Sequence, residues 1–378
     1  MSGRPNIPDK TQTRLWLQAG GRCQYEGCNE PLWRDDLTMA DMNGAYVAHI
    51  VAATPNGPRG DATLSPKLAI EISNLMLMCD KHHRLIDREQ VAEHPVDRLT
   101  AMKKAHEARI ELLTSLQEDK KSHVLFYGAN IGEQNAPLSW KKAAQAMIPL
   151  RYPAEPRGIE ISLRNSALED HRGDYWSMER QNLRSNLANS LRPRIVAGDV
   201  EHISIFALAP QPLLVDLGRF LSDIPAAEVY QLHREPPDWK WQESPDDFEY
   251  CIEEPATAYP TVALNLSLSA TIDDSRITTV LSQPDLSIWR MTIPEPHNDF
   301  LKSRDQLRLF RQQFRLLMDR IKAHHGQNVV LHVFPAVPVS VAVEIGRVWM
   351  PKADLPLCIY DQNRKLGGFA KALEFPED

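Results

Sequence analysis

The 378-residue sequence has few cysteines, no long apolar run and no surplus of basic charge. Five cysteines are too few for a disulfide framework in a chain of this length, and they predict a reducing, cytoplasmic environment. The apolar stretches 203–210 and 329–343 are too short, or too interrupted by proline, to span a bilayer, so we expect no membrane partner. The opening residues, MSGRPN, have no apolar core, so we expect no secretory signal.

The net charge of −7 excludes a protein that binds polyanions through its bulk field. Residues 1–121 hold 16 Lys and Arg against 17 Asp and Glu, which leaves 27 against 33 in the remainder. A nucleic-acid enzyme of this charge needs local basic patches, and we expect it to bind DNA well only when several copies come together. The length predicts two or three domains.

Two short pairs of metal-ligating residues lie far apart in the sequence. Cys23 and Cys28 are separated by four residues, and Cys79 and His82 by two. Thiolate and imidazole are ligands that zinc prefers, so the pairs predict a closed, tetrahedral zinc site that ties two chain segments together. The alternative is that these cysteines are buried free thiols, since Cys packs well as a small apolar residue. The polar residues around Cys28 and Cys79 favour the zinc site.

A second set, His49, Asn74 and His83, suggests an open site for chemistry. Neighbouring side chains point in different directions, so His83 does not join the zinc ion if His82 does. Taken singly, each histidine is more often a hydrogen-bonded polar residue than a ligand. The spacing of all three relative to the cysteines favours a second metal site.

This order of residues resembles the HNH, or ββα-metal, endonucleases. The family pattern is an Ala-His-Ile strand followed by Asn-Leu-x-x-x-Cys-x-x-Cys-His. The matching residues here are Ala48-His49-Ile50 and Asn74-Leu75-Met76-Leu77-Met78-Cys79-Asp80-Lys81-His82-His83, with His82 where the second cysteine usually stands. The resemblance implies an α+β domain with a structural zinc ion.

The resemblance also implies a role for each residue of the second set. His49 would be the general base that activates water, and Asn74 would hold the His49 loop. His83 would hold Mg²⁺ or a similar divalent cation against the scissile phosphate. Many HNH enzymes carry Asp before the first histidine as a metal ligand, where this chain has Ala48. The missing carboxylate could come from Asp61 or Asp87, and each is also explained as a solvated loop or helix residue.

The pattern of apolar residues predicts helices over 11–20 and 95–118 and a strand over 46–51 that delivers His49. We place a domain boundary near residue 120, which gives an HNH domain over 1–120 and a second domain over 121–378. From residue 122 onward, strands alternate with helices. This alternation predicts βαβ units and a largely parallel sheet.

A sequence repeat runs through the second domain. Segments 202–219 and 330–347 align without a gap at an offset of 128 residues. The identical pairs are Phe206/Phe334, Pro210/Pro338, Val215/Val343, Gly218/Gly346 and Arg219/Arg347. Each copy reads as a strand, a turn with proline, a helix that ends at Gly-Arg, and a second strand. The repeat predicts two fused Rossmann-like halves, about 122–250 and 251–378.

Ligands of open parallel sheets bind outside the carboxyl ends of the strands, near helix N-termini. Two such halves would form a pseudo-symmetric cleft that suits a nearly symmetric ligand. The HNH motif joined to this repeat resembles the HNH–SAVED effector nucleases of bacterial cyclic-oligonucleotide-based antiphage signalling (CBASS). The resemblance implies an α/β SAVED domain with two CARF-like halves that binds a cyclic di- or trinucleotide. It further implies a bacterial cytoplasmic protein that forms a homo-oligomer, a dimer or tetramer, on activation and cuts double-stranded DNA non-specifically.

The bases of such a ligand need aromatic platforms, and its phosphates need donors. The candidates are the aromatic Tyr175, Trp176, Trp239, Trp241, Trp289 and Trp349 and the basic Arg347, Arg364 and Lys365. Each aromatic residue is also explained by core packing, and Arg219 and Arg347 by their positions at helix C-termini.

Two other functions stay open. One is a restriction-type HNH nuclease whose C-terminal half reads DNA directly and needs no second messenger, which the acidic balance of that half disfavours. The other is a zinc-stabilised binding module without catalysis.

Overall fold

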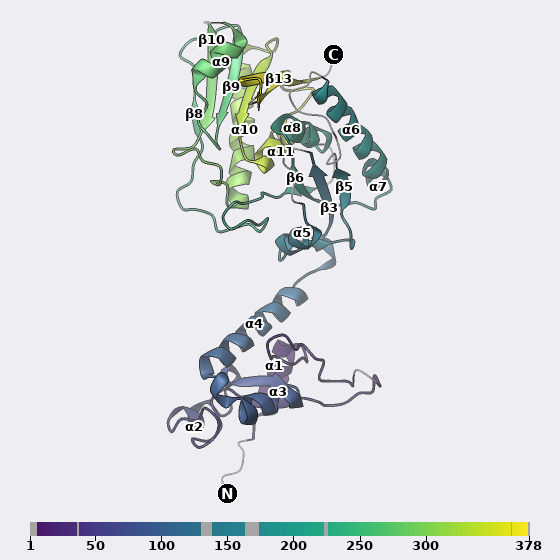
Figure 1. Ribbon diagram of the computed structural model, residues 1–378, viewed down its shortest axis with the longest axis vertical. Coiled ribbons are helices and arrows are strands. Elements are labelled where there is room, and N and C mark those ends of the chain that lie inside the picture. The colour runs from purple at the N-terminus through teal and green to yellow at the C-terminus, as the bar shows by residue number, and fades with distance from the viewer. Residues whose placement is uncertain are drawn as a thin grey trace. The chain divides into compact units, whose positions relative to one another are not determined.

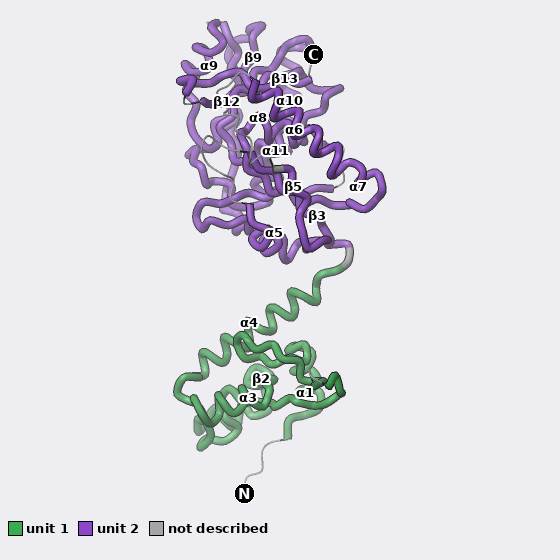
Figure 2. Tube along the Cα trace, turned by 45° about the vertical axis from the view of Figure 1, so that its right-hand side comes forward, with its two compact units in different colours: residues 1–117 green, residues 118–378 purple. Residues whose placement is uncertain are grey.

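The computed structural model describes residues 6–35, 38–129, 138–162, 174–222, 226–283, 285–363 and 365–376. The chain divides into two compact units, Met1–Gln117 and Glu118–Asp378 (Figure 2). No helix in the described ranges is both long enough and apolar enough to cross a bilayer.

The first unit is built around a two-stranded antiparallel sheet. Its elements are α1 (Asp9–Ala19), β1 (Tyr46–His49), α2 (Leu64–Leu68), η1 (Ile72–Asn74), β2 (Leu75–Met78), α3 (Asp80–Arg84), the π-helical turn η2 (Leu85–Glu89), η3 (Val91–Glu93) and α4 (Val96–Thr114). Tyr46 lies opposite Met78 in the sheet, and His49 lies opposite Leu75. All of β2 is buried, and α1 contacts both β2 and α4.

The ends of α1 and β1 are each explained by a local backbone or side-chain feature. At the end of α1, Gly20 has φ +60°, the left-handed conformation that glycine adopts without a steric penalty. The strand expected over 46–51 ends at His49, because the side chain of Asn74 takes both backbone hydrogen bonds of Val51. The helix expected over 95–118 is α4, which ends at Thr114.

The second unit contains two sheets with flanking helices. Its first half holds η4 (Glu118–Lys120), β3 (Lys121–Gly128), α5 (Trp140–Met147), β4 (Tyr152–Pro153), β5 (Ile159–Ser162), α6 (Tyr175–Ser190), α7 (Arg192–Val196), β6 (Ile203–Leu208), α8 (Gln211–Phe220) and β7 (Ala227–Val229). Its second half holds β8 (Cys251–Glu253), β9 (Thr261–Ser267), α9 (Asp274–Leu281), β10 (Leu286–Thr292), α10 (Arg304–His325), β11 (Leu331–Ala336), α11 (Val339–Val348), β12 (Leu357–Asn363) and β13 (Gly368–Phe375).

The same strand order occurs twice. The first sheet contains the run β5-β3-β6-β7, and the second contains the run β10-β9-β11-β12. Every neighbouring pair in both runs is parallel. The second sheet adds β8 and β13 as antiparallel edge strands, so it is a mixed sheet. This repeated order supports the duplication inferred from segments 202–219 and 330–347.

Helices α8 and α11, one from each half, pack against each other between the two sheets (Figure 1). They meet at the two repeated glycines. A Cβ atom on Gly218 would lie 1.9 Å from the Val343 carbonyl oxygen, and one on Gly346 would lie 1.9 Å from the Val215 carbonyl oxygen. The repeated glycine is therefore explained by close approach of two backbones.

Matching ion pairs flank this helix contact. In α8, Asp216 pairs with Arg219 at 2.7 Å and with Arg180 of α6 at 3.3 Å. In α11, Glu344 pairs with Arg347 at 3.1 Å and with Arg311 of α10 at 3.3 Å. Burial raises the pKa of both carboxyls, and the arginines offset part of that rise. The repeated Arg219 and Arg347 thus neutralise buried carboxylates.

Candidate functional site

The first unit brings together Cys23, Cys28, Cys79 and His82, whose ligand atoms all lie within 4.8 Å of one another. The His82 Nδ1 atom is 3.7 Å from the Cys23 Sγ atom and 3.1 Å from the Cys79 Sγ atom. Donors of a tetrahedral site with bonds of about 2.0–2.3 Å lie roughly 3.3–3.8 Å apart, so the four residues could hold one metal ion. Burial raises the pKa of the Cys23 and Cys79 thiols.

The segment between the first two cysteines is docked on β2. Gln24 is fully buried, and its Oε1 atom accepts a hydrogen bond of 2.8 Å from the Leu77 backbone N–H. The Tyr25 ring stacks on the His82 ring with centroids 4.1 Å apart. Burial, together with the charge of Lys81, lowers the pKa of His82. These contacts bring residues 23–28 to the end of β2, where the second pair of ligands begins.

Asn74 closes the loop that follows His49. Its Oδ1 atom accepts from the Val51 N–H at 2.8 Å, and its Nδ2 atom donates to the Val51 oxygen at 2.9 Å and to the Leu68 oxygen at 3.1 Å. The His49 Nε2 atom lies 2.9 Å from the Ala69 oxygen. Because a carbonyl only accepts, Nε2 carries the proton of a neutral His49 ring, and Nδ1 is then the basic nitrogen.

His83 lies between a tyrosine ring and a carboxylate. Its ring stacks on Tyr46 with centroids 5.0 Å apart, and its Nε2 atom lies 3.4 Å from the Asp87 Oδ2 atom. Burial raises the pKa of Asp87, but neighbouring His83 and Arg59 outweigh that effect and hold the pKa below its ordinary value.

Arg59 links the end of β1 with the turn after α3. It donates to the His49 oxygen at 3.3 Å, to the Ile50 oxygen at 2.8 Å, to the Ile86 oxygen at 2.6 Å and to the Asp87 Oδ1 atom at 2.6 Å. The described contacts thus connect His49 to His83 through Arg59 and Asp87. Sequence reasoning missed Arg59, whose only signal is a single basic residue in a loop rich in proline and glycine.

Asp61 has a structural task in the same unit. Its Oδ1 atom accepts hydrogen bonds from the Thr63 N–H at 2.8 Å and the Leu64 N–H at 2.7 Å, where α2 begins. These hydrogen bonds lower the pKa of the exposed carboxyl. The carboxylate beside His83 is that of Asp87, the second of the two residues that the sequence offered for the missing carboxylate.

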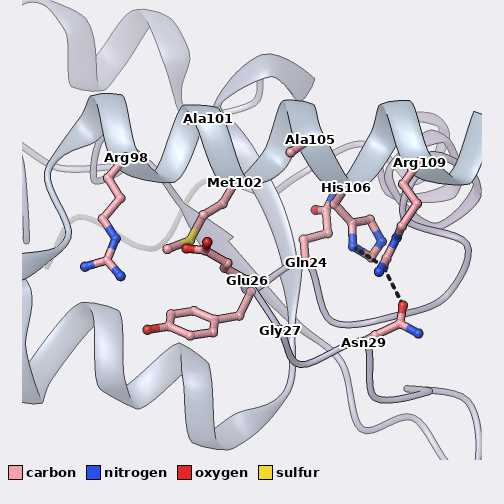
Figure 3. A pocket seen from close by; sticks show the side chains of 11 residues that line it. Gln24, Glu26, Gly27, Asn29, Arg98, Ala101, Met102, Ala105, His106 and Arg109 are labelled. Carbon is pink, nitrogen blue, oxygen red and sulfur yellow. Dashed lines mark hydrogen bonds between the residues drawn. The ribbon is translucent and has the colours of Figure 1, made fainter. Parts of the chain in front are cut away.

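A cavity of about 380 Å³ lies between α4 and the cysteine-bearing segment. Figure 3 shows Arg98 and Arg109 reaching from α4 toward the segment that carries Glu26 and Asn29. The Arg109 guanidinium donates to the Asn29 Oδ1 atom at 2.6 Å. The lining also includes Tyr25, which stacks on His82, so this cavity adjoins the metal-ligand cluster.

Most aromatic candidates for the ligand pocket are in the core of the second unit. Tyr175, Trp239, Trp289 and Trp349 are each at most 2% exposed. The indole N–H groups of Trp289 and Trp349 donate at 3.0 Å to the His325 Nε2 atom and the Leu355 oxygen. Rings buried in this way do not stack on a ligand, which corrects their assignment as platforms. Large aromatic rings fill the space between sheet and helices, which agrees with the alternative explanation by core packing.

The remaining candidates differ in exposure. Trp176 and Trp241 are half-buried, and Lys365 is exposed. Arg347 donates to the Ala227 oxygen and to Glu344, both at 3.1 Å, so it joins the two halves rather than facing an open pocket. Arg364 lies outside the described residues.

The helix N-termini at the carboxyl ends of the strands are linked across the halves. The Ser340 N–H, in the first turn of α11, donates to the Gln231 Oε1 atom at 3.2 Å. The Val337 N–H donates to the Gln211 Oε1 atom at 3.3 Å. Side-chain amides of the first half therefore occupy these backbone donors of the second half.

A second arginine-lined cavity, of about 360 Å³, lies at the opposite, amino-terminal ends of β6 and β7. The lining residues include Arg151, His202, Trp241, Arg304, Arg308 and Arg311. Three of these arginines pair with carboxylates, namely Arg304 with Glu228, Arg308 with Asp305, and Arg311 with Glu344. Burial, with the charges of Arg151, Arg347 and Arg304, lowers the pKa of His202 to about 4.

A family model described as SAVED, the "SMODS-associated and fused to various effectors sensor domain", matches residues 183–375. The comparison with curated proteins gave no match. Similar solved structures include the Acinetobacter baumannii Cap4 SAVED/CARF-domain containing receptor, with 2'3'3'-cAAA (12% identity, TM-score 0.42) and with 3'3'3'-cAAA (12%, 0.43). Another is the Moraxella osloensis Cap4 receptor (13%, 0.37). The matches cover 83%, 84% and 83% of this chain, and 66%, 67% and 66% of the receptor chains.

Proposed function

Because the chain belongs to the SAVED family, whose model matches residues 183–375, we propose that it is a cyclic-oligonucleotide sensor fused to a DNA endonuclease. The second unit binds a cyclic di- or trinucleotide second messenger in antiphage defence. Binding drives the chain into a homo-oligomer, and the assembled first units cut double-stranded DNA without sequence preference. The family description, a sensor fused to various effectors, fits a chain whose first unit is a separate compact fold.

The observation that carries the nuclease part is the position of Asn74. It closes the His49 loop by hydrogen bonds to Val51 in both directions, which is the task that the HNH resemblance assigns to it. The order β1, β2, α3 around it agrees with a ββα-metal arrangement. The three thiols and one imidazole at the other end of β2 are a donor set typical of structural zinc.

Each residue of this site has a separate role in hydrolysis. His49 accepts a proton from a water molecule at its Nδ1 atom while that water attacks the phosphorus atom and the bond to the leaving oxygen breaks. The hydrogen bond to the Ala69 oxygen keeps the His49 ring in the tautomer that this step requires. Asn74 holds the backbone that carries His49. A divalent cation held at His83 would stabilise charge on the phosphate and on the leaving oxygen.

The acidic balance of the chain explains why activation would require assembly. A single copy with a net charge of −7 attracts DNA weakly, whereas assembly would let several first units bind one duplex at the same time. The ligand therefore controls cleavage by controlling how many first units meet one duplex.

The test combines the full chain, supercoiled plasmid and Mg²⁺, with and without a panel of cyclic di- and trinucleotides. We expect cleavage only when both Mg²⁺ and one of the cyclic nucleotides are present. His49→Ala should lower the cleavage rate by about 100- to 10,000-fold, the usual contribution of a general base, while the affinity for the cyclic nucleotide stays unchanged. His297→Ala, which removes an exposed histidine of the second unit, is the matched control and should cut normally.

Each alternative gives a different result in the same assay. Cleavage with Mg²⁺ alone would indicate a restriction-type nuclease that needs no second messenger. Intact plasmid under every condition would indicate a binding module. Normal cleavage by His49→Ala would refute the assignment of the base.

A further inference from the structure

The imidazole of His83 has a buried nitrogen that lacks a hydrogen bond. Its Nε2 atom is shielded from solvent and has no hydrogen-bond partner among the described residues. The Asp87 Oδ2 atom is 3.4 Å away, without the alignment of a hydrogen bond. Buried polar atoms are rarely left without a hydrogen bond, so the position beside these two atoms suits a group that is not part of the chain.

The distance between the two atoms suits a shared cation. Neighbouring ligands of an octahedral Mg²⁺ ion, with bonds of about 2.1 Å, lie roughly 3.0 Å apart. His83 and Asp87 are four residues apart on consecutive helical turns, which places their side chains on one face. A cation of this kind usually takes one or two protein ligands and completes its shell with waters and phosphate oxygens.

We propose that Asp87 is the carboxylate ligand of the catalytic cation and takes the place of the carboxylate missing at Ala48. This inference rests on the proposed nuclease function. Side chains alternate along a strand, so Ala48 shares the face of Tyr46, the residue that stacks on His83. A carboxylate at residue 48 would therefore lie on the same face of the sheet as His83. In this chain the carboxylate beside His83 comes from Asp87 in the helical turn η2.

Arg59 fixes the orientation of this carboxylate. It holds the Asp87 Oδ1 atom at 2.6 Å and leaves the Oδ2 atom directed at His83. Its other hydrogen bonds, to the His49 and Ile50 oxygens, tie the cation ligand to the strand that carries the base. Arg59 is thus a positioning residue. Its charge is balanced by Asp87, so a bound dication leaves the site positive and suited to a phosphate.

The test measures Mn²⁺ binding by the zinc-loaded full chain in the absence of DNA. Binding is monitored as the loss of the electron paramagnetic resonance signal of free Mn²⁺. We expect Asp87→Asn to raise the Kd for Mn²⁺ by about tenfold or more, the usual range for a removed metal-site group. Asp61→Asn, which removes an exposed carboxylate of the same unit, should change the Kd less than about twofold. The zinc content and melting curve of each variant report whether the first unit is folded.

A second variant separates ligation from structural support. Arg59→Gln breaks the ion pair but keeps the Asp87 carboxylate. The lost orientation weakens Mn²⁺ binding and the lost positive charge beside the cation strengthens it, so the Kd should stay closer to the wild-type value than that of Asp87→Asn. The proposal is overturned if Asp87→Asn binds Mn²⁺ like the wild-type chain, or if Arg59→Gln weakens binding as much as Asp87→Asn. If wild-type chain cleaves DNA while Asp87→Asn binds Mn²⁺ normally, only the ligand assignment fails. If Asp87→Asn loses Mn²⁺ while the wild type never cleaves DNA, the cation site stands and the nuclease function fails.

Discussion

Replacing Gly218 by alanine should destabilise the second unit strongly. The added Cβ atom would lie 1.9 Å from the Val343 oxygen, 2.9 Å from the Val343 carbonyl carbon and 3.0 Å from the Arg347 nitrogen, whereas ordinary contact begins near 3.4 Å. All three are backbone atoms, so no side chain can rotate away, and α8 and α11 would have to separate by roughly 1.5 Å.

The size of the effect follows from this geometry. Overpacking a core commonly costs about 1–3 kcal/mol, and a clash with backbone belongs at the upper end, about 3 kcal/mol. For a domain of this size each kcal/mol lowers the Tm by about 2–4 °C, so we expect a fall of about 6–12 °C. Gly346→Ala should cost a similar amount, because its Cβ atom would lie 1.9 Å from the Val215 oxygen.

Thermal unfolding of the full chain, followed by calorimetry, measures this effect in the transition of the second unit. Gly368→Ala is the matched control, since a Cβ atom there would have nothing within 4 Å. We expect it to change stability by less than about 0.5 kcal/mol. If Gly218→Ala melted within about 2 °C of Gly368→Ala, the explanation of the repeated glycine by backbone contact would be refuted.

Two further predictions concern the metal cluster and a buried histidine. Cys28→Ser should lower the content of the zinc ion that we propose for this cluster and expose residues 23–28 to protease, because structural zinc contributes about 10–16 kcal/mol to small metal domains. Cys251→Ser in the second unit should leave the zinc content and the protease resistance unchanged. His202 has a folded-state pKa of about 4, below its ordinary 6.5, so the unfolded chain binds the proton first. Its contribution to stability is therefore complete above pH 6.5 and is lost as the pH falls toward 4. Unfolding free energies of the wild type and of His202→Gln between pH 7.5 and 4.5 should diverge in that window, and parallel curves would contradict the assignment.

The Cys/His cluster was predictable because chelating pairs leave a local signature in the sequence. Cys79 and His82 are three positions apart on a strand-to-helix turn, and Cys23 and Cys28 flank another turn, so spacing alone identified all four. Asn74 was singled out by its place in the HNH pattern, and its role stays a prediction. Arg59 was not singled out, because its four hydrogen bonds go to segments distant in sequence, and nothing in a polar loop distinguishes a buried arginine from a solvated one.

The duplicated fold was predictable only where the two copies kept identical residues. The β6–α8 and β11–α11 segments carry those identities because the glycines and arginines meet at the contact between the halves. The equivalence of strands β3 and β9 became visible only through the repeated strand order. The four buried aromatic candidates failed for a different reason. Tryptophan serves equally well as a core residue and as a platform, so residue type does not separate the two uses.

The reciprocal contact of α8 and α11 has a mechanical consequence. The backbone at Gly218 touches the other helix at Val343, and the backbone at Gly346 touches the first helix at Val215, so neither helix can tilt without pushing its counterpart. The buried carboxylates on these helices pass any such tilt outward to α6 and α10. The two halves are therefore mechanically coupled. A ligand that shifts the helix of one half would also shift the helix of the other.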